Sequence, residues 1–158
     1  MNKRAVLALL VFLIALGGLY LMRSIEEKPE KPPSPLPEIR ADQVTRLEIE
    51  RRKEGERMVL VLPKGEGATQ GKGWRIQEPI DYPADPTAMR ILMDKLGSLA
   101  VTEMVSEDSA KHGRFELGEG EGIALKVFAG EKLLTSFIVG KPSGGFTFLR
   151  LPDQDAVY

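Results

Sequence analysis

The feature that most restricts how this chain can fold is an apolar run near its N-terminus. Residues 5–22 read AVLALLVFLIALGGLYLM and contain no charged side chain. As a helix the run would be about 27 Å long, close to the roughly 30 Å hydrocarbon core of a bilayer. Its aliphatic side chains favour insertion into lipid. We therefore expect residues 5–22 to form a transmembrane helix, so that the folded domain is built from later residues.

The apolar run could be a cleaved secretory signal or an uncleaved anchor. Signal cleavage requires small residues two positions apart after the apolar core, but LYLMRS occupies residues 19–24. Ala15-Leu16-Gly17 is a weak match, and cleavage there would leave an exposed apolar terminus. Lipoprotein processing is excluded because the chain contains no cysteine. We predict a single-pass anchor.

The orientation of the anchor follows from its resemblance to an export signal. Residues 1–4 form a short basic tail, which export signals keep in the cytoplasm. Counting positive residues is less informative, because Arg23, Lys28 and Lys31 follow the run. The prediction is a single-pass membrane protein with residues 1–4 in the cytoplasm and its C-terminal domain outside.

Residues 23–37 are predicted to form a stalk. They contain five of the eleven prolines of the chain, a composition that favours extended polyproline geometry. Ser24–Pro37 would then reach roughly 40 Å. PEKP fits the PxxP spacing of a recognition motif, but a spacer beside a membrane is the favoured interpretation. The folded domain is predicted to cover residues 38–158.

Short strands dominate the pattern after residue 38. Three strands precede one main helix, a further strand and a short helix follow it, and three more strands come last. This order indicates an α+β domain with a mostly antiparallel sheet on one main helix. The predicted strands lie at 44–51, 57–62, 74–76, 101–105, 122–128, 133–139 and 146–151, and AVY at 156–158 starts another.

Two helices are predicted from residues that favour helix starts and ends. Asp85-Pro86 places a capping carboxylate before a proline at the first helical position. DSAKHG predicts a short helical turn that ends at Gly113, where a left-handed cap suits glycine. The predicted buried face of the main helix consists of Met89, Leu92, Leu96 and Leu99.

Composition and motifs argue against most chemical functions. Lysine and arginine (22) nearly balance aspartate and glutamate (23), so no net field favours nucleic acid. The absence of cysteine excludes disulfides, thiolate metal sites and cysteine nucleophiles. The only histidine, His112, is interpreted as a residue favoured by a helix C-terminus and not as a base. One histidine without cysteine argues against a transition-metal site.

Several local patterns only partly match known motifs. GEGATQGKG (65–73) departs from the P-loop at Glu66 and Gly73, and GEGEG (118–122) precedes a strand. These stretches and GKPSGG (140–145) are interpreted as turns. Three further patterns have structural interpretations: Ser143 lacks a nucleophile elbow, Asp153 and Asp155 lack the rest of a calcium loop, and Phe146 and Phe148 are predicted to be core residues.

The stretch GWRIQEPIDYPAD (73–85) and the following amphipathic helix, together with Phe137-Ile138-Val139-Gly140 and the aromatic strand 146–148, carry a family resemblance. The chain resembles the bacterial family described as domain of unknown function 4340. His112-Gly113-Arg114 replaces the usual Tyr-Gly-Leu, and Phe146 replaces a tyrosine. Members continue past the equivalent of Tyr158, so the resemblance implies a shortened domain that lacks its last strands or a second copy.

The resemblance implies a membrane-anchored, extracytoplasmic accessory protein of the bacterial inner membrane, and many members are encoded beside ABC-type export permeases. It assigns no catalytic residue, because none is known for the family. Packing and capping explain the stretch around Trp74. We expect Trp74 to plug the sheet against the helix, Pro79 and Pro83 to fix the corner, and Asp85 to cap the helix.

Three functions follow as hypotheses. The favoured one is a non-enzymatic interaction module with an ABC-type permease or another envelope protein as its partner. The second is a module that binds envelope lipid or glycan in a cleft between sheet and helix. The third is a hydrolase with two converging carboxylates. We predict no catalytic, cofactor-binding or metal-binding residue, no cofactor and no nucleic-acid partner; the sequence leaves the oligomeric state open.

Overall fold

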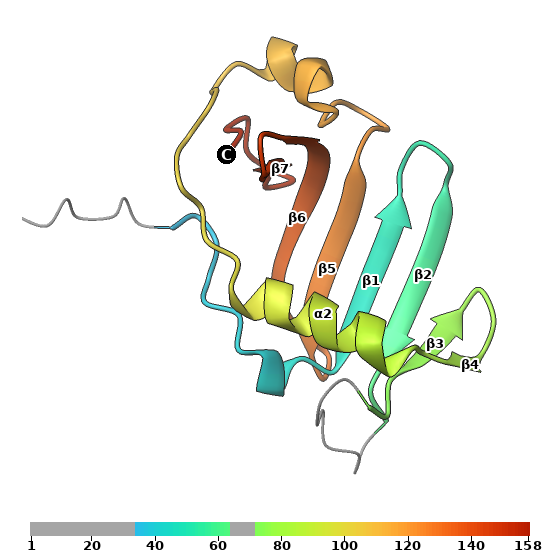
Figure 1. Cartoon of the computed structure of the whole chain (residues 1–158). Helices are drawn as coiled ribbons and strands as arrows, with labels where there is room; N and C mark the ends of the chain where they lie inside the picture. The colour runs from blue at the N-terminus through green and yellow to red at the C-terminus, as the bar shows by residue number, and fades with distance from the viewer. Residues whose placement is uncertain (1–33, 64–71) are drawn as a thin grey trace, which may run out of the picture. The chain divides into compact units, whose positions relative to one another are not determined.

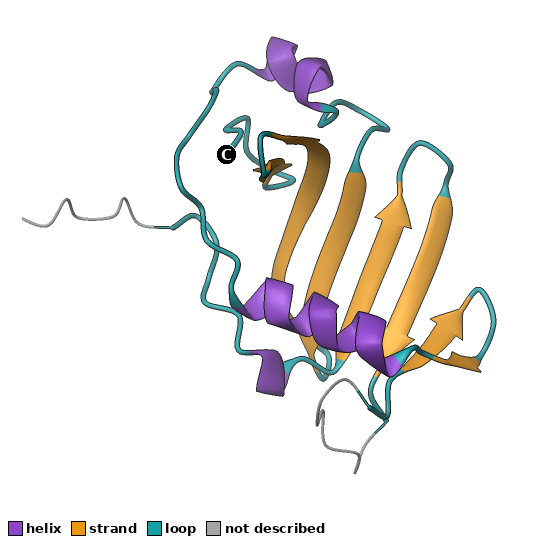
Figure 2. Cartoon of the chain, viewed as in Figure 1, coloured by secondary structure: helices purple, strands orange, loops and turns teal. Residues whose placement is uncertain are grey.

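One antiparallel sheet of seven strands is crossed on one face by the helix α2 (Pro86–Gly97), as Figures 1 and 2 show. This computed structural model describes residues 34–63 and 72–158. The predicted tail at 1–4, the anchor at 5–22, most of the stalk and most of the loop at 64–73 lie outside the described residues.

The strands follow the order β4-β3-β2-β1-β5-β6-β7, and every neighbouring pair is antiparallel. This confirms the predicted α+β class, with a mostly antiparallel sheet on one main helix. The strand bounds are β1 (Arg46–Arg51), β2 (Glu56–Val61), β3 (Arg75–Glu78), β4 (Tyr82–Pro83), β5 (Ile123–Ala129), β6 (Lys132–Ser143) and β7 (Phe146–Arg150).

The predicted strand at 101–105 is wrong. This segment runs as a loop, and Met104 and Val105 are 51% and 45% exposed, so its alternating pattern has no buried face. Directly after this segment, a single antiparallel bridge joins Ser106 to Val157. Val157 also bridges Arg150, so the strand predicted to start at 156–158 is present as one bridging residue beside β7.

Helix α2 begins as predicted at Asp85. Its Oδ1 accepts hydrogen bonds from the backbone N–H groups of Thr87 at 2.7 Å and Ala88 at 3.4 Å. The predicted apolar face is wrong at one position, because the helix ends at Gly97 and Leu99 lies beyond it, 36% exposed. The buried residues of α2 are Met89, Met93 and Leu96, spaced four and three apart on one face, and the predicted Leu92 is partly buried against the core.

Replacing Asp85 with alanine should lower the free energy of unfolding by about 1 kcal/mol, because two N–H groups of the first turn lose their acceptor. Asp94→Ala on the same helix is the matched control. Its ion pair with Arg90, at 3.6 Å, is exposed, and such pairs contribute little. The midpoints of chemical denaturation should separate the two variants; equal midpoints would contradict the capping role.

The short helix η3 (Ser109–Phe115) extends past the predicted end at Gly113. Glu116, with φ 57°, adopts the left-handed cap conformation in place of the glycine. The extension is explained by Phe115, which is buried and packs against Phe148 with ring centroids 4.7 Å apart. A second apolar cluster forms around this pair and contains Phe115, Leu117, Ile138 and Val157.

Polar side chains tie η3 and the following turn to the C-terminal loop. His112 lies in the last turn of η3 as predicted, but it is buried, and its Nε2 donates to the Asp155 carbonyl oxygen at 2.8 Å. The guanidinium of Arg150 donates to the carbonyl oxygens of Leu117, Leu151, Pro152 and Gln154. Burial, followed by the charge of Arg52, lowers the pKa of Arg150, while Asp155 acts in the opposite direction.

Candidate functional site

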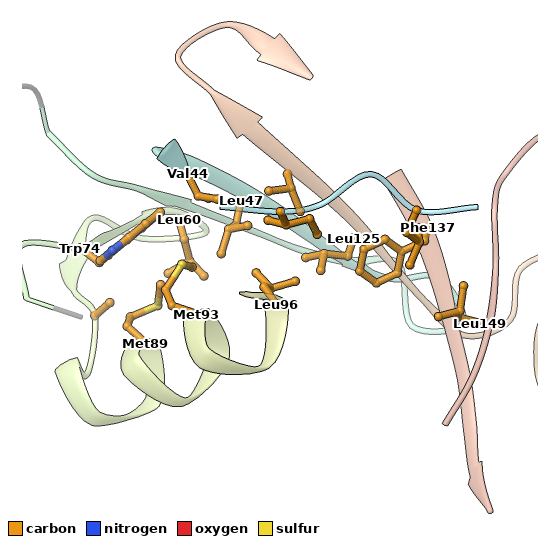
Figure 3. Close-up of a cluster of buried hydrophobic side chains, with 14 residues drawn as sticks. Val44, Leu47, Leu60, Trp74, Met89, Met93, Leu96, Leu125, Phe137 and Leu149 are labelled. Atoms are coloured by element: carbon orange, nitrogen blue, oxygen red, sulfur yellow. The ribbon is translucent and has the colours of Figure 1, made fainter. Parts of the chain in front are cut away.

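The space between the sheet and α2 is filled by side chains, so the predicted ligand cleft is not found there. Trp74 is 2% exposed and lies at one end of the packed row, near Leu60 and Met89, while Phe137 and Leu149 occupy the other end (Figure 3). This confirms the predicted role of Trp74 as a plug between sheet and helix. The two grooves with apolar linings that are described below lie beside α2 and not beneath it.

The groove that we call the sheet groove occupies the part of the helix-side face that α2 does not cover. Figure 1 shows α2 crossing β5, β1 and β2 near one end of these strands. The groove has a volume of about 580 Å³ and is lined by Ile49, Arg51, Glu56, Arg57, Met58, Pro79 and Ile123.

The apolar floor of the sheet groove is a consequence of strand periodicity. Side chains two apart on a strand share a face, so Ile49 lies on the same face as the buried Leu47. Ile49 pairs with Met58 across β1 and β2, and Ile123 pairs with the neighbouring Arg51 across β5 and β1. A helix of 12 residues is only about 18 Å long. The apolar pattern therefore continues past the helix, which leaves Met58 38% and Ile123 39% exposed.

The rim of the sheet groove is polar and nearly neutral. Arg51 pairs with Glu56 at 3.4 Å and Arg57 pairs with Glu78 at 3.6 Å, whereas the other partner of Arg57, Glu48 at 3.5 Å, lies on the opposite face of the sheet. Ile80 and Tyr82, which follow Pro79 in the chain, are 67% and 62% exposed. An apolar centre with a polar rim is the usual anatomy of a protein–protein interface.

A charged hollow of about 360 Å³ lies on the opposite face of the sheet, lined by Glu48, Glu50, Gly55, Arg57, Ala124 and Lys126. Glu48 and Glu50 are two apart on β1 and share this face. Glu48 is held between Arg46 at 3.2 Å and Arg57 at 3.5 Å. The hollow thus contains an ion-pair ladder across β1 and β2, in which one of the two carboxylates is occupied by two guanidinium groups.

The third hollow, which we call the hairpin groove, has a volume of about 490 Å³. It contains Phe146, which was predicted to be a core residue and is instead 66% exposed. The reason is its position directly after the Gly144-Gly145 turn, whereas Phe148, two residues further, packs on Phe115. The lining residues are Leu99, Ala100, Val101, Thr102, Glu103, Val105, Ser143, Phe146, Thr147, Phe148 and Tyr158.

Of the other predicted positions, Ser143 lines the hairpin groove, whereas Asp153 and Asp155 line none of the three hollows. Ser143 lies at the end of β6, and Asp153 and Asp155 lie in the loop after β7. Within residues 34–63 and 72–158, no group of three or more histidine, aspartate or glutamate side chains could hold a metal ion. Sequence reasoning missed both grooves; the only signal for the sheet groove was an apolar alternation longer than one short helix can cover.

Comparisons with known proteins agree with the resemblance drawn from Trp74 and its surroundings. Among the described residues, none of the helices is both long and apolar enough to span a bilayer. A search of curated proteins and a search of solved structures each found no match. A family model matches residues 74–158, which is 85 of 158 residues. The chain therefore belongs to the family described as domain of unknown function (DUF4340).

Proposed function

We propose that this chain is a single-pass, membrane-anchored accessory protein without enzymatic activity, whose extracytoplasmic domain binds an envelope partner protein through the sheet groove. The observation that carries the proposal is the uncovered apolar half of the helix-side sheet face, with Met58 38% and Ile123 39% exposed. An ABC-type export permease is the partner that the family resemblance implies.

The energetic argument favours a partner with a complementary apolar surface. Complete burial of a large aliphatic side chain is worth about 1.5–3 kcal/mol. Met58 and Ile123 are each a little over one-third exposed, so covering both contributes roughly 1–2 kcal/mol. Ile80 and Tyr82 are more than half exposed and would extend the contact. The ion-paired rim would supply orientation more than affinity.

A charge placed on the groove floor tests the proposal. Met58→Asp should lower recovery of the permease with the full chain from detergent extracts by at least about tenfold, because the partner would bury an unpaired carboxylate. Leu133→Asp is the matched control, since Leu133 is 47% exposed and lines none of the three hollows. Permease recovery that is unchanged by Met58→Asp, or lost equally with both variants, would contradict the proposal.

The anchor and its orientation require a separate test. A reporter that is active only outside the cytoplasm, fused after Tyr158, should be active and should remain with the membrane fraction. Activity in the soluble fraction, or a reporter active only in the cytoplasm, would overturn the membrane-anchored arrangement.

A second candidate function is the binding of an envelope lipid in the same groove. The volume of about 580 Å³ favours it, because small-molecule sites usually measure about 300–1,000 Å³ and are mostly apolar. Mass spectrometry of lipids extracted from the purified full chain distinguishes the two functions. A stoichiometric lipid that Met58→Asp removes, with no permease recovered, would favour the lipid-binding function.

A further inference from the structure

We propose that the hairpin groove is a self-association surface, filled by the β6–β7 hairpin tip of a second copy of this chain. The inference is independent of the envelope partner, because it concerns a different surface. It starts from an unusual combination: the same surface carries a protruding aromatic ring, Phe146, and a hollow of about 490 Å³.

The protruding half is a rigid hairpin. Ser143 pairs with Phe146 and Pro142 pairs with Thr147, so the tip is hydrogen-bonded up to its two-residue turn. Gly144 and Gly145 have φ values of 59° and 88°, which type I′ hairpin turns require. A rigid hairpin therefore presents Phe146 at 66% exposure. Ordering this ring in a contact costs little further conformational entropy.

One wall of the hairpin groove is formed by the segment that follows α2. Leu99 and Val105 are 36% and 45% exposed, and both line the groove with Val101. The backbone N–H of Val105 donates to the Val157 carbonyl oxygen at 2.7 Å, which fixes this wall against the C-terminal residues. The groove thus offers an apolar, backbone-anchored wall to an aromatic side chain.

Charge indicates that the occupant is a second copy. The segment carries Glu103, and the hairpin carries Lys141 next to its tip. Neither side chain takes part in a salt bridge with another described residue. In a two-fold contact, residue i of one copy meets residue j of the other, and the reverse. Lys141 of each copy would then face Glu103 of the other copy, which gives two attractive pairs in each dimer.

The acidic segment argues against an anionic lipid surface as the occupant. Glu103 and Glu107 are both exposed there, and negatively charged membranes attract basic segments.

The small size of the contact limits the strength of the dimer. A standard interface buries about 800 Å² on each partner, and the exposed part of Phe146 supplies only about 100–150 Å² of this. We therefore expect a weak dimer, with a Kd of about micromolar.

Cross-linking in cells tests the contact directly, because the chain contains no cysteine that could react elsewhere. Two differently tagged full-length copies, one with Ser143→Cys and one with Thr102→Cys, are expressed together and treated with a short bismaleimide. The expected product carries both tags. The control pair is Ser143→Cys with Leu133→Cys, because position 133 is ten residues away along β6, about 34 Å in an extended strand. It should give no such product.

Two further comparisons decide whether the predicted contact produces the cross-link. Adding Phe146→Ser to both copies should lower the yield at least fivefold, whereas Ile80→Ser, at a site equally exposed (67%), should leave it unchanged. Lys141→Glu in both copies, or Glu103→Lys in both, should lower the yield. A Lys141→Glu copy paired with a Glu103→Lys copy should restore it, since both facing pairs are again attractive.

The proposal is overturned if the yield of the doubly tagged product is no higher than in the control pair. It is also overturned if the Phe146→Ser variant cross-links fully, or if the charge exchange fails to restore the yield. Loss of permease recovery affects none of these readouts. The two interfaces can therefore fail separately.

Discussion

Replacing Trp74 with alanine is expected to lower the free energy of unfolding by about 3–5 kcal/mol. A domain of ordinary stability has only about 5–15 kcal/mol in total, so this variant should be close to the limit of folding. The reason is the position of the ring, which is 2% exposed between the sheet and α2, next to Leu60 and Met89 (Figure 3). Alanine would leave a cavity joining the two layers.

Trp74→Phe separates the loss of ring volume from the loss of polar contacts. The indole Nε1 of Trp74 has no hydrogen-bond partner among the described residues, so phenylalanine removes no bond to these residues and only part of the ring volume. We expect a cost below about 2 kcal/mol. Urea denaturation followed by far-UV circular dichroism measures both variants. Equal losses for Phe and Ala would contradict a role based on filling space.

Gly140→Ala is expected to give the second large effect, a loss of about 1–3 kcal/mol or more from overpacking. A Cβ at Gly140 would overlap the carbonyl oxygen of Phe115 and lie 2.9 Å from Leu117 Cγ. The carbonyl is backbone and cannot rotate away. Relief of the overlap therefore requires η3 to separate from β6, which opens the apolar cluster around Phe115 and Ile138.

The matched control is Gly113→Ala, where the added Cβ meets only Glu121 Oε2 at 3.8 Å, an ordinary contact. For a domain of this size, 1 kcal/mol shifts the melting midpoint by roughly 3–6 °C. Scanning calorimetry should therefore place Gly140→Ala well below both the wild type and Gly113→Ala. A midpoint for Gly140→Ala equal to that of the control would show that η3 does not pack on β6 as described.

Features that depend on neighbours in the chain were predictable. Asp85 caps α2 because a carboxylate before a helix and a proline at its first position act within one turn. The hairpin of β1 and β2 followed from alternating residues around a polar turn. Trp74 was correctly placed against the helix because a large ring between a strand and an amphipathic helix has few other places to be buried.

The errors share a physical cause, which is that burial depends on what covers a segment. The alternation at 101–105 is typical of a strand, yet only Val101 is partly buried against the core, and residues 102–105 are exposed. Phe146 has the pattern of a core residue but lies at a hairpin tip beyond the covered sheet. Glu116, and not Gly113, adopts the left-handed cap, because burial of Phe115 extends η3 beyond the glycine.

By itself, the sequence determined the order and type of the main elements, the cap of α2 and the role of Trp74, since these follow from contacts a few residues apart. Only the tertiary structure decided where the grooves lie. Ile49, Met58 and Ile123 come together through pairing registers that join distant parts of the chain. Their exposure depends on where a helix of 12 residues crosses the sheet, and no local pattern of side chains specifies that position.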